Sequence, residues 1–222
     1  KNIITIEDPI ERKIEGVTQV QVNTKAGITF ASGLRSILRN DPDIIMVGEI
    51  RDYETSKIAV ESALTGHMVF STIHTNDAAG AITRLIDMGI EPYLISSSLV
   101  GVVAQRLARI LCEECKQPVT VTRQHILSMI PDFPLEEGEK EIKLYKAKGC
   151  PYCNNTGYKG RIGIFEFLKV TETIQKLMLI RASAKQMRDS AIKEGMQTMR
   201  QNGFLKAKEG ITTVEEVLRV II

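Results

Sequence analysis

The fold class of this chain of 222 residues is decided by one stretch of sequence, Ile44-Ile45-Met46-Val47-Gly48-Glu49-Ile50-Arg51-Asp52. Its first four residues are all apolar, which is typical of a strand that is covered on both faces. Polar residues follow Gly48 at once, where the strand ends. The stretch therefore predicts a buried strand of an α/β protein, with functional side chains at its carboxyl end.

Two other runs have the same form. Residues 3–6 lead into Glu7-Asp8-Pro9-Ile10-Glu11, and residues 68–73, a third buried strand, lead into His74-Thr75-Asn76-Asp77. Helix-like stretches lie at 30–39, 55–64 and 78–88. Strands that alternate with helices at this spacing are joined by right-handed crossovers, so the sequence predicts a mainly parallel sheet with flanking helices.

The polar groups after these strands are candidates for a ligand site. The carboxyl ends of parallel strands lie along one edge of a sheet, where open α/β folds bind ligands. Carboxylates from Glu7, Glu11 and Glu49 can hold Mg²⁺ through water and orient an attacking water, and His74 can sense a terminal phosphate. The alternative is that each acid is only a solvated loop residue or a helix cap.

The four cysteines form two C-x-x-C pairs, Cys112 with Cys115 and Cys150 with Cys153, separated by 34 residues. Four thiolates close a tetrahedral Zn²⁺ site with no open position for catalysis. The pattern therefore predicts structural zinc, the alternative being four reduced, metal-free cysteines.

Composition excludes several classes of protein. The apolar fraction is 43%, and 29 Lys and Arg residues against 27 acids leave a net charge of +2. This balance argues against a protein that coats nucleic acid or a membrane surface. The apolar runs are far shorter than the roughly 20 residues that span a bilayer. We expect a soluble, cytosolic protein.

The remaining segments suggest a domain plan. Residues 93–111 are expected to form one long helix, and residues 120–148, polar and proline-containing, an irregular insertion. The predicted domains are an α/β core at 1–110, a zinc-binding insertion at 111–165 and a helical region at 166–222.

Three long motifs resemble those of the secretion and pilus ATPases. The run Thr5-Ile6-Glu7-Asp8-Pro9-Ile10-Glu11 is similar to their Asp box, residues 38–52 (LRNDPDIIMVGEIRD) to their Walker B segment and residues 65–76 (TGHMVFSTIHTN) to their His box. With the four cysteines and the ending at 210–218 (GITTVEEVL), the match covers essentially the whole chain. The resemblance implies a RecA-like fold, with residues 1–110 as part of an ATPase core, and the use of ATP and Mg²⁺.

The resemblance also implies roles for single residues. Glu11 would polarise the attacking water, Glu7 would organise the same loop, and Glu49 would act on Mg²⁺ and its water shell. His74 would contact the γ-phosphate or signal its loss. Gly48 departs from the pattern, because many P-loop enzymes place an aspartate before the acid.

Three more residues match basic positions of the family. Arg35 and Arg51 would reach toward nucleotide, in the same or a neighbouring subunit, and His67 would act on it less directly. The alternative for Arg35 is the ordinary preference for cations in the last turn of a helix.

One motif of such enzymes is missing. The sequence has no G-x-x-x-x-G-K-[ST] run, whose backbone amides and lysine cradle the β- and γ-phosphates. Since the chain starts at Lys1 and the other three motifs are intact, we expect a carboxy-terminal piece of a longer ATPase rather than a degenerate member. The piece alone should hydrolyse essentially no ATP.

The resemblance is greatest to the type II secretion ATPase, with type IV pilus assembly ATPases next. It implies a homo-oligomer, a hexamer in this family, that drives pseudopilus assembly through inner-membrane platform proteins. It places the protein on the cytoplasmic face of the inner membrane, where only partner proteins would hold it. Two alternatives belong to other classes: a nucleic-acid motor, against which the charge argues, and a non-catalytic zinc or interaction module.

Overall fold

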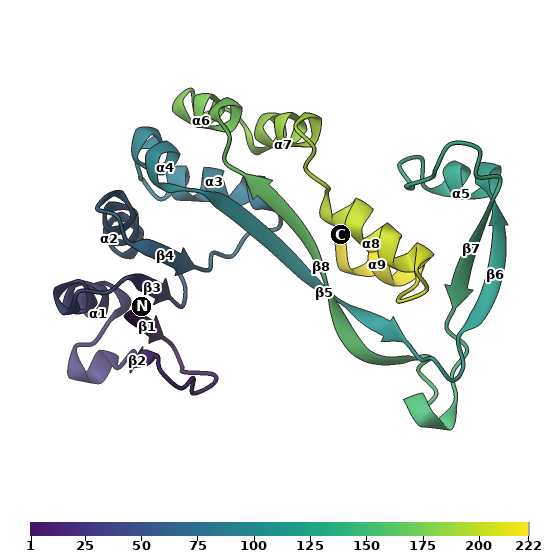
Figure 1. Ribbon diagram of the computed structural model, residues 1–222, viewed down its shortest axis with the longest axis horizontal. Helices are drawn as coiled ribbons and strands as arrows, with labels where there is room; N and C mark the ends of the chain where they lie inside the picture. Colours follow the sequence, from purple (N-terminus) through teal and green to yellow (C-terminus); the bar gives the residue numbers. More distant parts are fainter. Residues whose placement is uncertain (222) are drawn as a thin grey trace. The chain divides into compact units, whose positions relative to one another are not determined.

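The protein is described by a computed structural model for residues 1–221, which form two compact units (Figure 1). The first unit consists of Lys1–Val102 and Leu168–Glu194, and the second of Val103–Phe167 and Gly195–Ile222. The chain therefore crosses from the first unit to the second and back before it ends in the second.

The first unit contains a four-stranded parallel sheet, which confirms the predicted α/β fold. Its strands are β1 (Ile3–Glu7), β2 (Thr18–Gln21), β3 (Ile44–Val47) and β4 (Met68–Ser71), in the order β2-β1-β3-β4. Ile6 lies opposite Val47, and Val47 lies opposite Ser71, so three strands end at the same edge. The buried middle of the sheet is apolar, as Ile6, Ile45 and Val47 have no exposed surface.

The helices of this unit are α1 (Phe30–Ile37), α2 (Tyr53–Leu64), α3 (Ala78–Asp87), α4 (Pro92–Ser98), α6 (Glu172–Leu179) and α7 (Ala184–Lys193), with short 3₁₀ turns η1 (Thr24–Ala26) and η2 (Leu38–Asn40). Three of these helices, α1, α2 and α3, overlap the predicted helix-like stretches at 30–39, 55–64 and 78–88. The carboxylate of Asp52 accepts the Thr55 N–H at 2.8 Å, and that of Asp77 accepts the Gly80 N–H at 2.7 Å. Two acids that follow strands are thus helix caps, which satisfy free amides of the first turn.

The prediction that residues 68–73 form a buried strand is wrong. The strand β4 is shorter, and the side chains of Met68 and Phe70 are 50% and 56% exposed. Within the described residues β4 is the last strand of the sheet, paired with β3 alone. An apolar run therefore fails to distinguish a central strand from a half-covered one.

The predicted long helix at 93–111 is also wrong. The helix α4 ends at Ser98, and β5 (Gly101–Leu111) follows and pairs with β8 (Tyr158–Lys169). Leu99, Val103, Leu107 and Leu111 recur every four residues, which is a helical spacing. Pairing with a strand 50 residues away overrides this local pattern, because β-branched residues also suit a strand.

The second unit is built on that strand pair. Its other elements are β6 (Gln117–Thr122), α5 (Arg123–Met129), β7 (Glu141–Lys146), η3 (Pro151–Cys153), α8 (Met199–Lys208) and α9 (Val214–Ile221). The expectation of an irregular segment at 120–148 is wrong, since β6 and β7 form an antiparallel hairpin that holds α5 near its tip. Ile142 and Leu144 face the core of Ile164, Phe204 and Val217, so alternation, not polarity, decides the structure here.

A buried acid ties the last helix to β5. The carboxylate of Glu216 accepts the Arg109 N–H at 2.9 Å and bonds to the guanidinium groups of Arg109 and Arg219 at 2.6–2.7 Å. Burial alone would raise the pKa of Glu216, but these hydrogen bonds outweigh it and lower the pKa to about 2. Arg109 also lies over the Tyr158 ring, at 4.2 Å from its centroid.

The two units divide the predicted helical region 166–222. The helix α6 packs with α4 and α7 packs with α3, whereas α8 and α9 cover the hairpin core. No helix in residues 1–221 has both the length and the apolar character needed to traverse a lipid bilayer.

Candidate functional site

The carboxyl edge of the parallel sheet brings together Glu7, Glu49 and His74, as the sequence predicts. Glu7 is the last residue of β1, Glu49 lies two residues beyond β3, and His74 lies three residues beyond β4. Because the three strands are in register, the polar residues that follow them start from one line. The edge thus gathers groups from segments 67 residues apart in the chain.

Glu49 is the centre of this edge. Its carboxylate, only 11% exposed, accepts a hydrogen bond from Arg51 Nε and lies 3.4 Å from His74 Nε2. The neighbouring carboxylate, through its hydrogen bond and its charge, raises the pKa of Arg51 above the usual value. The carboxylate of Glu49 therefore contacts both a guanidinium cation and an imidazole. The side chain of His74 is 85% exposed and so is accessible to a ligand.

The backbone around Glu49 is held by the two neighbouring strands. The Gly48 N–H donates to Ile6 O at 2.7 Å, and the Ile50 N–H donates to Thr72 O at 2.9 Å. The hydroxyl of Thr72 donates to Gly48 O at 2.6 Å. These bonds hold the backbone of the Glu49 turn against the segment that leads to His74.

Gly48 explains the departure from the expected acid pair. A Cβ at this position would lie 3.2 Å from Ile6 O and 3.3 Å from Glu7 Cα. These contacts are tighter than ordinary van der Waals contact, so a side chain at position 48 would require the backbone of β1 to shift by a few tenths of an ångström. Glycine at this position is therefore consistent with the close packing between β1 and the turn after β3.

Glu7 and Glu11 differ in their surroundings. Glu7 is 9% exposed, and one carboxylate oxygen accepts hydrogen bonds from Thr5 Oγ1 at 2.6 Å and Gln19 Nε2 at 2.9 Å. Glu11 lies in the loop after β1 and is exposed. Glu7 is therefore part of the scaffold, whereas Glu11 is accessible to water and ligand.

The other two basic candidates, Arg35 and His67, contact groups other than Glu49. Arg35 of α1 pairs with Glu54 in the first turn of α2 at 2.5 Å, with both side chains more than half exposed. His67 precedes β4 and His74 follows it, so they lie at opposite ends of that strand. His67 Nδ1 is 3.0 Å from Ser62 O, at the end of α2. His67 thus belongs to a helix terminus and is not brought together with Glu49.

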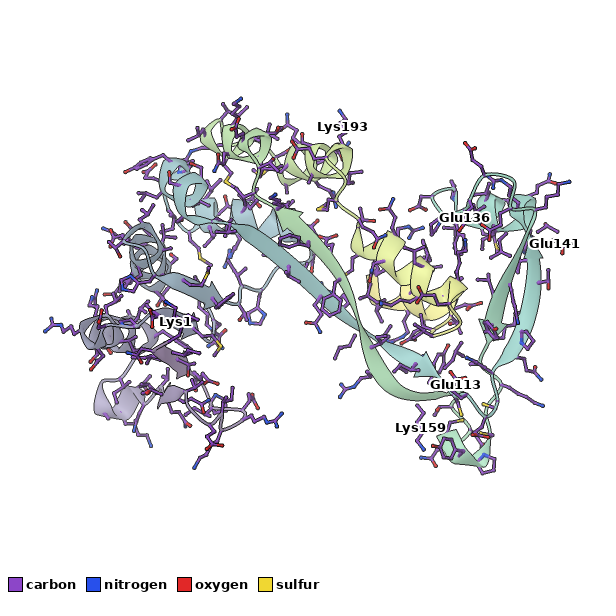
Figure 2. The ribbon with its side chains drawn as sticks, viewed as in Figure 1. Lys1, Glu113, Glu136, Glu141, Lys159 and Lys193 are labelled. Carbon is purple, nitrogen blue, oxygen red and sulfur yellow. The ribbon has the colours of Figure 1, made fainter. Side chains whose placement is uncertain are left out.

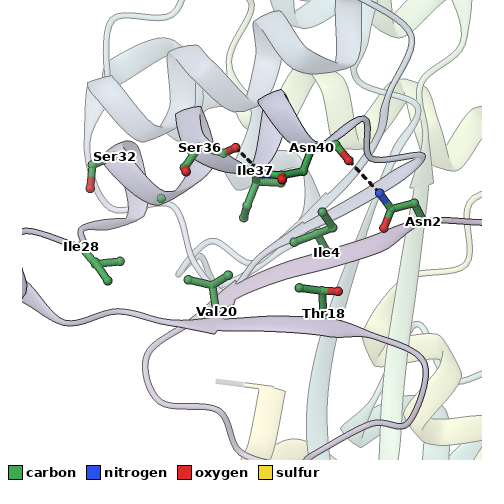
Figure 3. A pocket seen from close by; sticks show the side chains of 10 residues that line it. Asn2, Ile4, Thr18, Val20, Ile28, Ser32, Ser36, Ile37 and Asn40 are labelled. Carbon is green, nitrogen blue, oxygen red and sulfur yellow. Dashed lines mark hydrogen bonds between the residues drawn. The ribbon is translucent and has the colours of Figure 1, made fainter.

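A cavity beside this sheet lies away from Glu49 and His74. It has a volume of about 550 Å³ and lies between α1 and the strands β1 and β2 (Figure 3). Ile4, Val20 and Ile37 line it, and Asn2 and Asn40 lie at its rim. It contains none of the predicted site residues, so it gives no support for the nucleotide site.

The sequence analysis missed residues that organise the edge. Thr5, Gln19 and Thr72 all bond to groups at the strand ends. Arg188 of α7 donates to Asp77, the cap of α3, at 3.0 Å. Thr72 stands inside the segment that resembles the His box, so that motif offered a signal for it; an isolated glutamine, threonine or distant arginine offers none.

The second candidate site is the cysteine cluster, which the structure assembles as predicted. The four Sγ atoms lie within 4.8 Å of one another, and three of the pairs are 3.7–3.9 Å apart. A tetrahedron with metal–sulfur bonds of about 2.3 Å has edges of about 3.8 Å. All four cysteines are free thiols, so the donor set and its spacing fit a Zn²⁺ ion.

Backbone amides support the sulfur atoms. The N–H groups of Gly157 and Cys150 donate to Cys153 Sγ at 3.2 and 3.3 Å, and together with neighbouring thiols they outweigh burial and lower the pKa of Cys153 to about 6. Burial raises the pKa of Cys112 to about 11. In Figure 2 the sulfur atoms gather in the loops close to Glu113 and Lys159. A divalent cation would offset the burial of four thiolates.

The whole chain, including both candidate sites, is similar to known proteins. The family model described as "Type II/IV secretion system protein" matches residues 1–219. The chain is 52% identical to the type II secretion system ATPase E of Vibrio cholerae serotype O1, over 99% of this chain and 42% of that protein. It is also 52% identical to the type IV pilus assembly ATPase PilB of Thermus thermophilus, over 98% of this chain and 24% of that protein.

A solved structure is similar as well. It is the crystal structure of the pilus retraction motor PilT with bound ADP, with a TM-score of 0.65 and 28% identity over 98% of this chain and 52% of that chain. The chain thus spans about two fifths of the secretion ATPase, a quarter of PilB and half of PilT.

Proposed function

The chain belongs to the family of type II/IV secretion system proteins, and from that premise we propose that it is the C-terminal part of a motor that hydrolyses ATP. The observation that carries this proposal is the contact of Glu49 with Arg51 and His74 at the carboxyl edge of the sheet. A phosphate ligand at this edge would meet the guanidinium of Arg51, the imidazole of His74 and the buried carboxylate of Glu49, which contacts both. The names of the most similar relatives, which are ATPases, support the same activity.

Each residue has a distinct part in the proposed reaction. When bound, Mg²⁺ would supply positive charge that offsets the charge of the phosphates. Glu49 would hold the water shell of that ion, and exposed Glu11 would accept the proton of the water that attacks the γ-phosphorus as its bond to ADP breaks. His74 would contact the γ-phosphate. Because His74 also contacts Glu49, departure of the phosphate would change the surroundings of that carboxylate.

The arginines would balance the phosphate charge. Arg51 is 64% exposed and Arg35 54% exposed, so either guanidinium can leave its acid and turn to a phosphate oxygen. An arginine in such a place stabilises the charge of the transferring group. The cradle for the β- and γ-phosphates is not encoded in these 222 residues and would come from another part of the same protein.

The cysteine cluster would serve structure rather than chemistry. Zn²⁺ held by Cys112, Cys115, Cys150 and Cys153 has four protein ligands and no position for water. We propose that it fixes the loops at the far end of the strand pair β5–β8 and presents them as a docking surface.

The whole motor would work as a ring. We propose a homo-oligomer, a hexamer, on the cytoplasmic face of the inner membrane, held there by platform proteins and driving pseudopilus assembly for type II secretion. Assembly of a type IV pilus is a second candidate, favoured by the 52% identity to PilB. Deleting the gene separates the two: loss of exoprotein release supports secretion, and loss of surface pili supports pilus assembly.

The activity is tested with the full-length protein that contains this chain. We expect Glu49→Gln to lower Mg²⁺-dependent phosphate release at least about a hundredfold, the scale of removing one group that stabilises developing charge. Glu61→Gln is the matched control, because Glu61 is an exposed acid of α2 that pairs only weakly, at 4.0 Å, with Lys57. Wild-type turnover in the Glu49 variant would contradict the proposal. The 222-residue chain alone should release no phosphate above background.

A further inference from the structure

The loop between β1 and β2 carries Glu11 and is exposed from Glu11 to Gly16. Ile14, its one large apolar side chain in that range, is 55% exposed and so does not anchor it by burial. An exposed loop keeps one conformation only where hydrogen bonds tie its backbone to a rigid element. The hydrogen bonds of this loop therefore determine the position of Glu11.

The side chain of Gln19 forms hydrogen bonds to the backbone of this loop. Gln19 of β2 accepts the Ile14 N–H at Oε1, 2.8 Å away, and donates from Nε2 to Arg12 O at 3.0 Å. The same Nε2 donates to the Glu7 carboxylate at 2.9 Å. The two loop contacts enclose the stretch just after Glu11, and the third contact reaches the sheet.

The sheet end of this connection is rigid. Gln19 lies opposite Thr5 in the parallel register of β1 and β2, and Thr5 Oγ1 donates to the same Glu7 oxygen at 2.6 Å. Glu7 and Thr5 are both buried. Gln19 thus joins a fixed pair inside the sheet to the backbone of an exposed loop.

We propose that Gln19 is a positioning residue: it holds the loop so that Glu11 faces the attacking water at the strand-end site. The proposal rests on the proposed function, in which Glu11 accepts the proton of that water. Only a primary amide donates twice and accepts at once from one planar group. Glutamate at position 19 would keep the acceptor, lose both donors and set a second charge beside Glu7.

The hold on the loop is tested without activity. In full-length protein with Gln19→Met, amide hydrogen exchange at 12–16, above all at Ile14, should rise at least tenfold. Gln21→Met is the matched control, because Gln21 is an exposed residue on the same face of β2, opposite Glu7. Unchanged exchange in the Gln19 variant, or an equal rise in both variants, would overturn the proposal.

The effect on the reaction is tested by kinetics. Gln19→Met and Gln19→Glu should each lower kcat at least tenfold and leave the Kd for ATP within twofold, since neither touches the phosphate-facing groups. In a Glu11→Gln background the same changes should lower kcat no further, because Gln19 acts through Glu11. A further tenfold loss in that background, or full kcat in the single variants, would refute the positioning role.

The two proposals fail in different ways. If wild-type full-length protein hydrolyses no ATP, the proposed function falls, and the exchange result alone supports or overturns the hold of Gln19 on the loop. If Glu11→Gln lowers kcat while Gln19→Met leaves it unchanged, the proposed function stands and the inference about Gln19 falls.

Discussion

The two candidate sites differ in how complete they are within this chain. The cysteine cluster has all four donors at distances of 3.7–3.9 Å for three of its pairs, with backbone amides on its sulfur atoms. The acidic edge holds Glu49, Arg51 and His74 together, but His74 is 85% exposed and no phosphate-binding loop is encoded in the sequence. One site is closed by short loops of its own, and the other is open.

The difference shows what each site requires. A structural metal site needs four ligands and their supporting amides, which two loops can supply. A site for a charged, multi-group substrate needs groups from several segments and freedom for them to move. The second unit should therefore depend on metal for stability, whereas the open edge should contribute to activity and little to stability.

Removal of metal should have the largest effect on stability. Chelation, or Cys112→Ser, should lower the midpoint of thermal unfolding of the second unit by more than about 10 °C, since a structural zinc site contributes directly to folding. Hydrogen exchange should locate the change in residues 103–167, with β1, β3 and β4 unaffected. Equal protection with and without chelator would show that the cluster is metal-free.

Loss of the buried acid should come next. Glu216→Gln should cost about 1.5–3 kcal/mol of unfolding free energy, because the buried carboxylate loses the charge that strengthens its hydrogen bonds to Arg109 and Arg219, whose side chains are 45% and 57% exposed. Glu215→Gln, at the exposed neighbouring position, should change it by less than about 0.5 kcal/mol. Denaturant titration measures both, and similar values for the two variants would contradict the assigned role.

The same acid predicts a pH dependence. The folded pKa of Glu216, about 2, is below the ordinary value, so its contribution is present above about pH 4.5 and is lost as the pH falls toward 2. The loss should be about 3 kcal/mol, from roughly 1.4 kcal/mol per pKa unit. In Glu216→Gln this part of the pH dependence should be absent, and its persistence would assign it to other groups.

A glycine beside the cysteines should have a smaller effect. Gly157 has φ of +75°, and a Cβ there would lie 2.6 Å from Ala147 Cβ. Gly157→Ala should therefore cost about 2–3 kcal/mol, from backbone strain and overpacking. At Gly138, φ is +82° with nothing within 4 Å of the added Cβ, so Gly138→Ala should cost only about 1 kcal/mol. Equal costs in thermal unfolding would remove the packing argument.

The ion pair next to the open edge should have the smallest effect. Asp77 and Arg188 are 27% and 39% exposed and 3.0 Å apart, so their coupling should be at most about 1 kcal/mol. A double-mutant cycle with Asp77→Asn, which keeps the helix cap, and Arg188→Gln measures it. The pair Glu91–Arg181, at 3.6 Å and more than half exposed, should give nearly zero. A larger coupling at Glu91–Arg181 would contradict the ranking by exposure.

Prediction from the sequence succeeded where the signal is local and failed where it is not. The strand 44–47, the cap at Asp52 and the four clustered cysteines are confirmed, because hydrophobic runs, capping residues and ligand spacing are local properties. The local pattern at 93–111 predicts a helix, but in the structure the second half of this run is a strand that pairs with β8. Gln19 carries no motif at all, and its role depends on the register of β1 and β2.

By itself, the sequence determined the class of the fold, the family and the identity of the groups that can do chemistry, since these follow from periodicity, motifs and donor types. Three features became clear only from the folded chain. The buried carboxylate of Glu7 accepts a hydrogen bond from Gln19, and His67 lies at the opposite end of β4 from His74. The polar segment after Lys116 forms the hairpin β6–β7. The physical reason is that hydrogen bonding and burial between distant segments outweigh local preferences once the chain is compact.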